Sequence, residues 1–248
     1  MKRRIPNWLK QPLGPSPSAM KTSLVLDESG LCTVCEEAAC PNRAECYGQR
    51  TATFMILGAV CTRNCRYCNV SSGTPALPDP DEPSKVAEAV SRLGLRYVVV
   101  TSVTRDDLND KGAAQFAKVI GALKGLPSKP RIEILTPDFL GSPESVARVI
   151  EARPDVWGHN IEVVPRLFPF MRPGADYHLS LDLLRRVKAE APHIVTKSSL
   201  MIGLGETVQE ILEACRDLRD AETDLVVIGQ YLSPTSNHTP VERFYTPQ

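Results

Sequence analysis

Short apolar runs that alternate with amphipathic segments set the fold of this 248-residue chain. Runs of this length that are rich in Val and Ile predict strands. The segments between them repeat apolar residues at i, i+3, i+4 and i+7, as helices with one buried face do. Strands separated by helices form a parallel sheet, because each helix returns the chain to the start of the next strand. The predicted strands are 51–60, 96–103, 131–137, 156–164, 194–203 and 224–232, and the helical repeats fall at 86–93, 116–123 and 208–215, with a further helix beginning at Ser142.

Polar residues stand near the C-terminal end of most of these strands. In a doubly wound sheet they would gather at one switch point, but here they are spread over the strands. We therefore expect a partial (β/α)6 barrel of the α/β class, with its site at the C-terminal mouth. Asn160 and Glu162 alternate in one strand, so both should point to the barrel interior, although a solvent-facing pair is the alternative. The polar positions are Thr101, Ser102, Thr136, Asn160, Glu162, Lys197 and Gln230.

The charge balance and the N-terminal sequence bear on the binding partners and the cellular location of the chain. Lys plus Arg and Asp plus Glu both number 29, so composition gives no support for binding nucleic acid or an anionic membrane. The only obvious basic run is Lys2-Arg3-Arg4. No apolar run is long enough to span a bilayer, and the N-terminus lacks the apolar segment of a secretory signal. We expect a cytoplasmic location.

Seven of the eight cysteines lie between Cys32 and Cys68. In a chain without a secretory signal, such clustering indicates metal or redox chemistry rather than disulfides. Cys215, the eighth, falls on the apolar face of its predicted helix, where a packed core thiol is expected.

The first cysteine motif is CxxxCxxC, made by Cys61, Cys65 and Cys68 directly after the first strand. Three thiolates on one loop can hold three irons of a [4Fe–4S] cube and leave the fourth iron open. An open iron can chelate S-adenosylmethionine (SAM), whose reductive cleavage yields a 5′-deoxyadenosyl radical. Tyr67, just before the third cysteine, is part of this pattern. A zinc loop is the alternative, but zinc sites use four ligands in paired spacings.

The second motif, CxxxxCxxxxxC, places Cys35, Cys40 and Cys46 upstream of the barrel. Three further thiolates in one segment predict a second cluster. Cys32 and Cys35 also form a CxxC, so a four-cysteine zinc site is the alternative. Otherwise Cys32 is a spectator thiol.

The run VCEEAACPNRAECYGQRTATFMILGAVCTRNCRYCNV, which holds both motifs, resembles the lipoyl synthase family of radical SAM enzymes. The similarity extends over nearly everything from Trp8 onward. Paired cysteine motifs separated by a TATFMILG-like strand are specific to that family. The further matching segments are 101–112, 159–184, 199–207 and 230–244.

The resemblance implies a sulfurtransferase of lipoate biosynthesis and protein lipoylation. It implies two [4Fe–4S] clusters and SAM as cofactors, and the insertion of two sulfur atoms at C6 and C8 of a protein-bound octanoyl group. The cluster on Cys61, Cys65 and Cys68 would cleave SAM, and the auxiliary cluster on Cys35, Cys40 and Cys46 would be consumed as the sulfur source. The residues expected to bind the cofactor are Tyr67, Thr101, Ser102, Asn160, Glu162, Lys197, Gly203 and Glu206.

The implied partners are octanoylated lipoyl carrier domains, namely the E2 subunits of 2-oxoacid dehydrogenases and the glycine cleavage H protein. A one-electron reductant such as flavodoxin or ferredoxin and an iron–sulfur carrier are implied as well, with no nucleic acid and no membrane. We expect an irregular N-terminal extension at 1–51 with the auxiliary motif, a radical SAM partial barrel at 52–232, and a tail at 233–248. The tail is truncated relative to the family, whose Arg-Ser-Ser-Tyr motif is absent here.

Two other functions fit parts of the pattern. A biotin-synthase relative would be another radical SAM sulfur inserter, although the N-terminal cysteine trio argues against it. The alternative that is not an enzyme is a non-catalytic iron–sulfur or zinc protein.

Several further residues have two readings each. The run 105–107 is a polar site loop or a solvated loop with ion pairs, and His238 is a substrate-side or a surface residue. Trp8 and Trp157 are expected to anchor packing.

Overall fold

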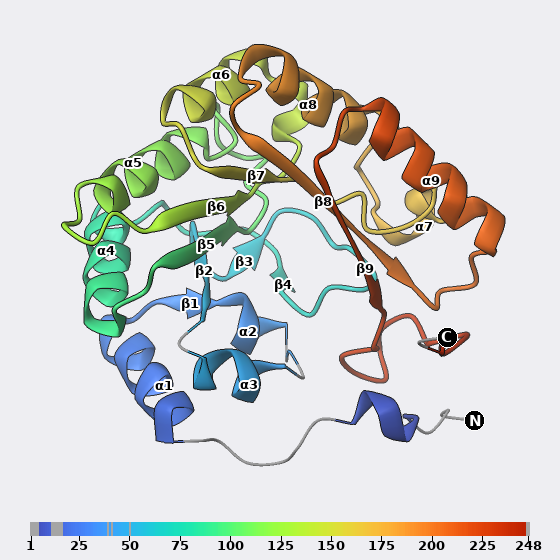
Figure 1. The fold of residues 1–248 in the computed structure, drawn as a ribbon, viewed down its shortest axis with the longest axis horizontal. Helices are drawn as coiled ribbons and strands as arrows, with labels where there is room; N and C mark the ends of the chain where they lie inside the picture. Colours follow the sequence, from blue (N-terminus) through green and yellow to red (C-terminus); the bar gives the residue numbers. More distant parts are fainter. Residues whose placement is uncertain (1–4, 11–16, 39, 41, 50, 247–248) are drawn as a thin grey trace.

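A curved sheet is the centre of the fold (Figure 1). The computed structural model describes residues 5–10, 17–38, 40, 42–49 and 51–246. In this part of the chain the strand order is β1-β2-β5-β6-β7-β8-β9, with β2 to β9 parallel and β1 antiparallel to β2 at one edge. These strands are β1 (Cys32–Thr33), β2 (Thr53–Ile56), β5 (Tyr97–Ser102), β6 (Arg131–Leu135), β7 (Val156–Gly158), β8 (Val195–Ile202) and β9 (Leu225–Gln230).

Helices follow the strands and form an arc on the convex side of the sheet, which gives the open partial barrel that the alternation predicts (Figure 1). Ser142 caps α6 by accepting from Ser145 N, and Thr207 caps α9 with a full capping box. No helix in the described part of the chain has the length and apolar character needed to cross a bilayer. The helices are α4 (Glu82–Leu93), α5 (Ala113–Lys124), α6 (Pro143–Glu151), α7 (Phe168–Met171), α8 (Tyr177–Glu190) and α9 (Val208–Asp220), with 3-10 turns η2 (Phe139–Gly141) and η3 (Pro165–Leu167).

The N-terminal extension is more ordered than the sequence suggests. It contains η1 (Asn7–Leu9), α1 (Pro17–Ser29), α2 (Val34–Glu37) and α3 (Arg43–Gly48), and β1 joins the main sheet. The prediction of an irregular segment was therefore wrong for the described residues, and the basic run at 2–4 lies outside them. A buried hydrogen bond from Thr22 Oγ1 to Tyr47 O, 3.0 Å long, ties α1 to α3. This tertiary contact stabilises short helices whose sequence shows little periodicity.

Two strands are shorter than the sequence predicts, and residues with positive φ follow the end of each. The run 51–60 stops as β2 at Ile56, because Leu57 and Gly58 turn the chain with φ values of 68° and 87°. A separate parallel pair follows, β3 (Val60–Cys61) and β4 (Ser71–Ser72). The run 156–164 stops as β7 at Gly158, and Glu162 has φ of 66°. The strand-alternation argument for Asn160 and Glu162 was thus wrong, because both lie beyond the strand.

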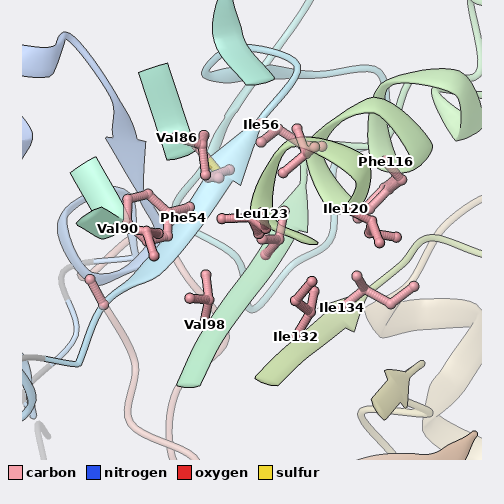
Figure 2. Packing of buried hydrophobic residues seen from close by; sticks show 14 of the residues in the cluster. Phe54, Ile56, Val86, Val90, Val98, Phe116, Ile120, Leu123, Ile132 and Ile134 are labelled. Atoms are coloured by element: carbon pink, nitrogen blue, oxygen red, sulfur yellow. The ribbon is translucent and has the colours of Figure 1, made fainter. Parts of the chain in front are cut away.

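The main core lies between the convex face of the sheet and helices α4 and α5 (Figure 2). Phe54 and Ile56 from β2 and Ile132 and Ile134 from β6 are 0–1% exposed. Because neighbouring side chains in a strand point to opposite faces, the residues between them face the concave side. Trp157 fills part of the same core, as expected, and its Nε1 donates to Thr136 Oγ1 at 3.1 Å.

The apolar face of α9 is only partly covered in the described part of the chain. Val208 and Leu212 remain 57% and 47% exposed, and the fully buried apolar residues of the helix are Ala214 and Leu218. Cys215, predicted as a packed thiol, is partly buried. Trp8 is 53% exposed, so it does not anchor packing among the described residues. Periodicity identified the helix but not how much of its face would be covered.

We expect Phe116→Ala to lower the free energy of unfolding by about 3–5 kcal/mol, because a fully buried ring leaves a cavity. The ring meets Phe139 edge-on with centroids 6.1 Å apart, so this contact is lost too. Leu77→Ala is the control, since Leu77 is 90% exposed and should change stability by less than about 0.5 kcal/mol. Urea denaturation of the reduced chain measures both. Equal losses would show that the α5 face is not the core described above.

Candidate functional site

The CxxxCxxC loop is built where β2 ends. Leu57 N donates to both carboxylate oxygens of Glu82, at 2.9 and 3.1 Å, which fixes the turn that leads into the loop. Cys61 closes β3, and Cys65 and Cys68 follow within one tight turn, where Cys68 N donates to Cys65 O at 3.0 Å. Because parallel strands all end at the same edge of the sheet, the loop lies at the C-terminal mouth.

The loop is joined to the segment after β5. Thr62 N and Thr62 Oγ1 both donate to Thr104 O at 3.0 Å, and Asp106 N donates to Thr62 Oγ1 at 3.1 Å. The Cys61 sulfur accepts two backbone hydrogen bonds, from Arg63 N at 3.4 Å and from Thr104 N at 3.3 Å. Backbone N–H groups aimed at a cysteine sulfur stabilise the thiolate form that binds iron.

The thiols of this trio are close neighbours in a buried setting. Burial raises the pKa of Cys65, and the neighbouring Cys61 raises it further, while Arg172 and a hydrogen bond with Tyr67 lower it. Burial raises the pKa of Cys68 to about 11, with Cys65 and Cys61 adding to the rise. When iron binds such a thiol, the thiol loses its proton and the thiolate coordinates the metal.

The second trio lies in the helical part of the extension. Burial raises the pKa of Cys35 and of Cys46, and Cys40 adds to the rise at both thiols. Cys40 N donates to Cys35 O at 3.2 Å. Cys32 lies in β1, and the charged neighbours that add to its raised pKa after burial are Glu37, Glu82 and Glu36. The three cysteines of the CxxxxCxxxxxC motif are therefore neighbours of one another.

Neither trio has the geometry of a single-ion site. Among the described residues, no group of three or more His, Cys, Asp or Glu side chains is arranged to hold one metal ion. A zinc ion draws its ligands to about 2.3 Å, so their sulfurs crowd together. In a [4Fe–4S] cube each thiolate binds a different iron, which allows wider sulfur spacing.

Asn160, Glu162 and Tyr67 come together beside the cysteine loop. Asn160 Nδ2 donates to Glu162 Oε1 at 3.1 Å. Burial raises the pKa of Glu162, although Arg172 opposes the rise. Burial also raises the pKa of Tyr67, with Glu162 adding to the effect. A positive φ at a residue other than glycine is a strained conformation of the kind that clusters at functional sites, and Glu162 adopts one here.

Three buried polar atoms near the mouth have no hydrogen-bond partner among the described residues. They are Ser102 Oγ at the end of β5, His159 Nε2 just beyond β7, and Arg172 Nε. Buried polar groups are nearly always satisfied, so unpaired ones indicate a position for a polar ligand. A ligand with amino, carboxylate and hydroxyl groups, such as SAM, fits this set.

His159 and Arg172 were not among the expected cofactor residues. His159 is 1% exposed, its Nδ1 lies 2.9 Å from Thr136 O, and burial lowers its pKa to about 4. It is therefore neutral, and with Nδ1 as donor its Nε2 is an acceptor. Arg172 forms no ion pair in the described part of the chain, and its Nη1 donates to Asn160 O at 2.8 Å. The sequence signal for both was their place within the family-like segment 159–184.

Four other expected cofactor residues already have partners inside the protein. Thr101 Oγ1 donates to Leu135 O at 2.8 Å, and Lys197 Nζ pairs with Glu133 Oε1 at 2.7 Å. Glu206 accepts from Gly203 N at 2.6 Å and from Leu204 N at 2.8 Å, which closes its own turn. The structure thus brings Tyr67, Asn160 and Glu162 together, while Lys197, Gly203 and Glu206 serve other contacts.

The loop at 105–107 is not the solvated loop that its charges allowed. Arg105 is 1% exposed, donates to Leu57 O at 3.3 Å and pairs with Asp107 at 2.8 Å. A buried guanidinium that bonds the turn after β2 stabilises the base of the cysteine loop.

The C-terminal tail crosses the outer side of the cysteine loop. His238 Nε2 lies 3.0 Å from Cys68 O, and Thr239 N donates to Arg66 O at 3.3 Å. His238 therefore contacts the cysteine loop. A cavity of about 700 Å³ lies between the tail and the loop, lined by Asn64, Cys65, Arg66, Cys68, Phe170, Pro173, Asn237, His238, Thr239 and Pro240.

Comparison with known sequences gives consistent results. The profile of the Radical SAM superfamily matches residues 55–218. A lipoyl synthase of Desulfotalea psychrophila is 52% identical over 242 residues, which cover 98% of this chain and 81% of that protein. A lipoyl synthase of Caldanaerobacter subterraneus is 52% identical, with 99% and 86% covered. One from Xylella fastidiosa is 50% identical, with 98% and 66% covered.

Solved structures show the same fold at low sequence identity. SuiB of Streptococcus suis bound to S-adenosylmethionine superposes with a TM-score of 0.61 at 11% identity, over 82% of this chain and 47% of that one. Methylornithine synthase superposes with a TM-score of 0.55 at 13% identity, over 93% and 68%.

We expect Gly203→Ala to destabilise the chain by about 1–3 kcal/mol or more, because Gly203 has φ of 107° and any Cβ is strained there. That Cβ would also lie 2.2 Å from Gln230 Nε2 and 2.5 Å from Arg243 O, so the tail must move. Gly229→Ala is the control, since nothing lies within 4 Å of its added Cβ. Thermal unfolding and limited proteolysis of the tail measure the effect. Equal stability of the two variants would contradict the packed tail.

Proposed function

This chain belongs to the lipoyl synthase family of the radical SAM superfamily, and from this premise we propose how its residues divide the reaction. The activity is the insertion of two sulfur atoms, at C6 and C8, into an octanoyl group carried on a lipoyl domain. An alkyl C–H bond is not acidic, so a general base could not remove its proton and radical chemistry is required. The relatives at 50–52% identity are lipoyl synthases, which disfavours the biotin-synthase alternative.

Cys61, Cys65 and Cys68 are proposed to bind the [4Fe–4S] cluster that works with SAM. When bound and reduced, this pair of cofactors supplies the 5′-deoxyadenosyl radical that removes hydrogen from the octanoyl chain. Support comes from the position of the trio at the barrel mouth, from the N–H groups that face the Cys61 sulfur, and from the mutual proximity of the three thiols.

Cys35, Cys40 and Cys46 are proposed to bind the auxiliary cluster, which supplies the sulfur atoms as a substrate of the reaction. One hydrogen bond carries this assignment. Asn69 Nδ2, just after Cys68, donates to Glu37 O at 2.7 Å, two residues beyond Cys35. The bond joins the segments that hold the two trios, which supports a role for both in one reaction. Cys32, outside the trio spacing, is proposed as a spectator.

SAM is proposed to bind between the cysteine loop and the ends of β5, β7 and β8. Glu162 and Asn160 offer acceptors and a donor for its amino and ribose groups, and Tyr67 packs beside them. Arg172 offers an unpaired N–H to the carboxylate, and Ser102 and His159 offer polar atoms without partners. Thr101, Lys197, Gly203 and Glu206 are proposed to shape this space through the contacts they already make.

The substrate proteins are lipoyl domains, and the specific partners are proposals. These are octanoylated E2 subunits and the glycine cleavage H protein, a flavodoxin or ferredoxin as electron donor, and an iron–sulfur carrier. A cytoplasmic location is proposed as well. We propose 1–51 as the auxiliary-cluster segment, 52–232 as the barrel and 233–248 as a tail on the cysteine loop.

Metal analysis tests the cysteine assignments. Anaerobic reconstitution should give about eight iron and eight sulfide per chain, as two [4Fe–4S] clusters require. Cys65→Ala and Cys40→Ala should each remove about half of the iron, from different clusters, while Cys32→Ala and the control Cys215→Ala should keep all of it. Stoichiometric zinc in the N-terminal trio would contradict the two-cluster assignment.

Product analysis tests the division of labour. With SAM and dithionite, Cys65→Ala should form no 5′-deoxyadenosine, because its cluster can no longer cleave SAM. Cys40→Ala should still form 5′-deoxyadenosine but no lipoyl group on an octanoylated H protein, because the sulfur source is missing. Mass spectrometry of the carrier measures the second product. Lipoyl carrier made by Cys40→Ala would refute the sulfur-source role.

A further inference from the structure

A buried arginine within the CxxxCxxC loop, Arg63, forms hydrogen bonds with two carboxylates from other loops. Arg63 Nε and Nη2 donate to the two oxygens of Asp106, at 2.7 and 3.1 Å. Its Nη1 and Nη2 donate to the two oxygens of Asp138, at 2.6 and 2.7 Å. The side chains of Arg63 and Asp138 are 6% and 0% exposed. Two bidentate pairs on one buried guanidinium form a rigid clamp.

The clamp joins three segments that are distant in sequence. Arg63 lies between Cys61 and Cys65, Asp106 follows β5, and Asp138 follows β6. The same two loops supply the N–H groups that reach the Cys61 sulfur, one from Arg63 itself and one from Thr104, two residues before Asp106. Fixing Arg63 to Asp106 therefore fixes both hydrogen bonds to that sulfur.

We propose that Arg63 is a positioning residue that, clamped between Asp106 and Asp138, holds the Cys61 sulfur against its two N–H donors and thereby sets the reduction potential of the CxxxCxxC cluster. This inference rests on the proposed function of that loop. Reduction adds one electron to the cluster, so hydrogen bonds to its sulfur ligands favour the reduced form.

The carboxylates act in the opposite direction from the hydrogen bonds. The clamp combines one guanidinium with two carboxylates, so it places one net negative charge beside the cysteine loop. Asp138 is fully buried, and although burial alone would raise its pKa, the hydrogen bonds and charge of Arg63 outweigh this and hold its pKa low. A buried negative charge is poorly screened and disfavours an added electron. The potential thus depends on a balance that two substitutions can separate.

The two substitutions predict shifts of opposite sign. Arg63→Lys keeps the positive charge but cannot form two bidentate pairs, so the loops loosen, the N–H donors withdraw and the potential falls. Asp138→Asn keeps the side-chain volume and removes the buried negative charge, so the potential rises. Each shift should equal about a tenfold change in the one-electron equilibrium, or ~59 mV. A role confined to folding would move both variants the same way.

The experiment is a redox titration of the reconstituted chain with dithionite as the electron source. Because each trio has three cysteines, the variants are compared in a Cys40→Ala background, which should retain only the CxxxCxxC cluster. The change that SAM causes in the EPR signal then identifies that cluster. Arg186→Lys is the matched control, because Arg186 pairs with Glu190 on the exposed face of α8, away from the mouth. Its potential should equal that of the unchanged protein.

Opposite shifts in Arg63→Lys and Asp138→Asn, with iron content retained, support the inference. Potentials equal to the control would overturn it, and so would loss of iron from both variants together with a lowered thermal midpoint of the iron-free chain. If the unchanged protein gives no SAM-responsive signal, the proposed function of the loop fails instead, so the two failures are distinguishable.

Discussion

The curvature of a parallel sheet packed on one face is the constraint on which the rest of this structure depends. Helices α4, α5, α6, α8 and α9 follow the convex side, and the residues under α4 and α5 are almost completely buried. Because the strands are parallel, their C-terminal ends all lie at one edge. The CxxxCxxC loop and the loops that follow β5, β6, β7 and β8 begin at that edge, so their residues meet without any specific long-range signal in the sequence.

Buried ion pairs then stabilise the loops at the C-terminal mouth of the barrel. Arg63 and Arg105 are both nearly inaccessible, and each bonds a carboxylate and lies next to the cysteine loop. Burying such groups is favourable only when their hydrogen bonds are satisfied with good geometry. A loop that must bind a labile cofactor is thereby positioned before the cofactor arrives. By contrast Arg172, Ser102 and His159 keep unpaired polar atoms at the same mouth, which is where a polar ligand fits.

The extension is bonded to the barrel and does not simply precede it. β1 pairs with β2, α1 is bonded to α3, and Asn69 reaches Glu37. The sequence pattern predicted an irregular extension because short helices with few periodic residues give a weak signal. Their stability comes from contacts with residues far along the chain, which no local pattern contains. The same limit explains Val208 and Leu212 on α9, whose spacing is helical and whose exposure depends on what packs above them.

The sequence by itself determined the parallel α/β class, the positions of the main helices and strands, and the two cysteine trios. Periodicity and ligand spacing are local properties, so a single sequence reveals them. Helix α8 was not predicted, although Asp176 caps it and Leu181, Leu184 and Val187 follow at helical spacing. Only the tertiary structure decided that β7 ends at Gly158, that Lys197 pairs with Glu133, and that Arg63 bridges Asp106 and Asp138. Those outcomes depend on which distant groups arrive within hydrogen-bond distance, and that is set by packing the whole chain rather than by any segment of it.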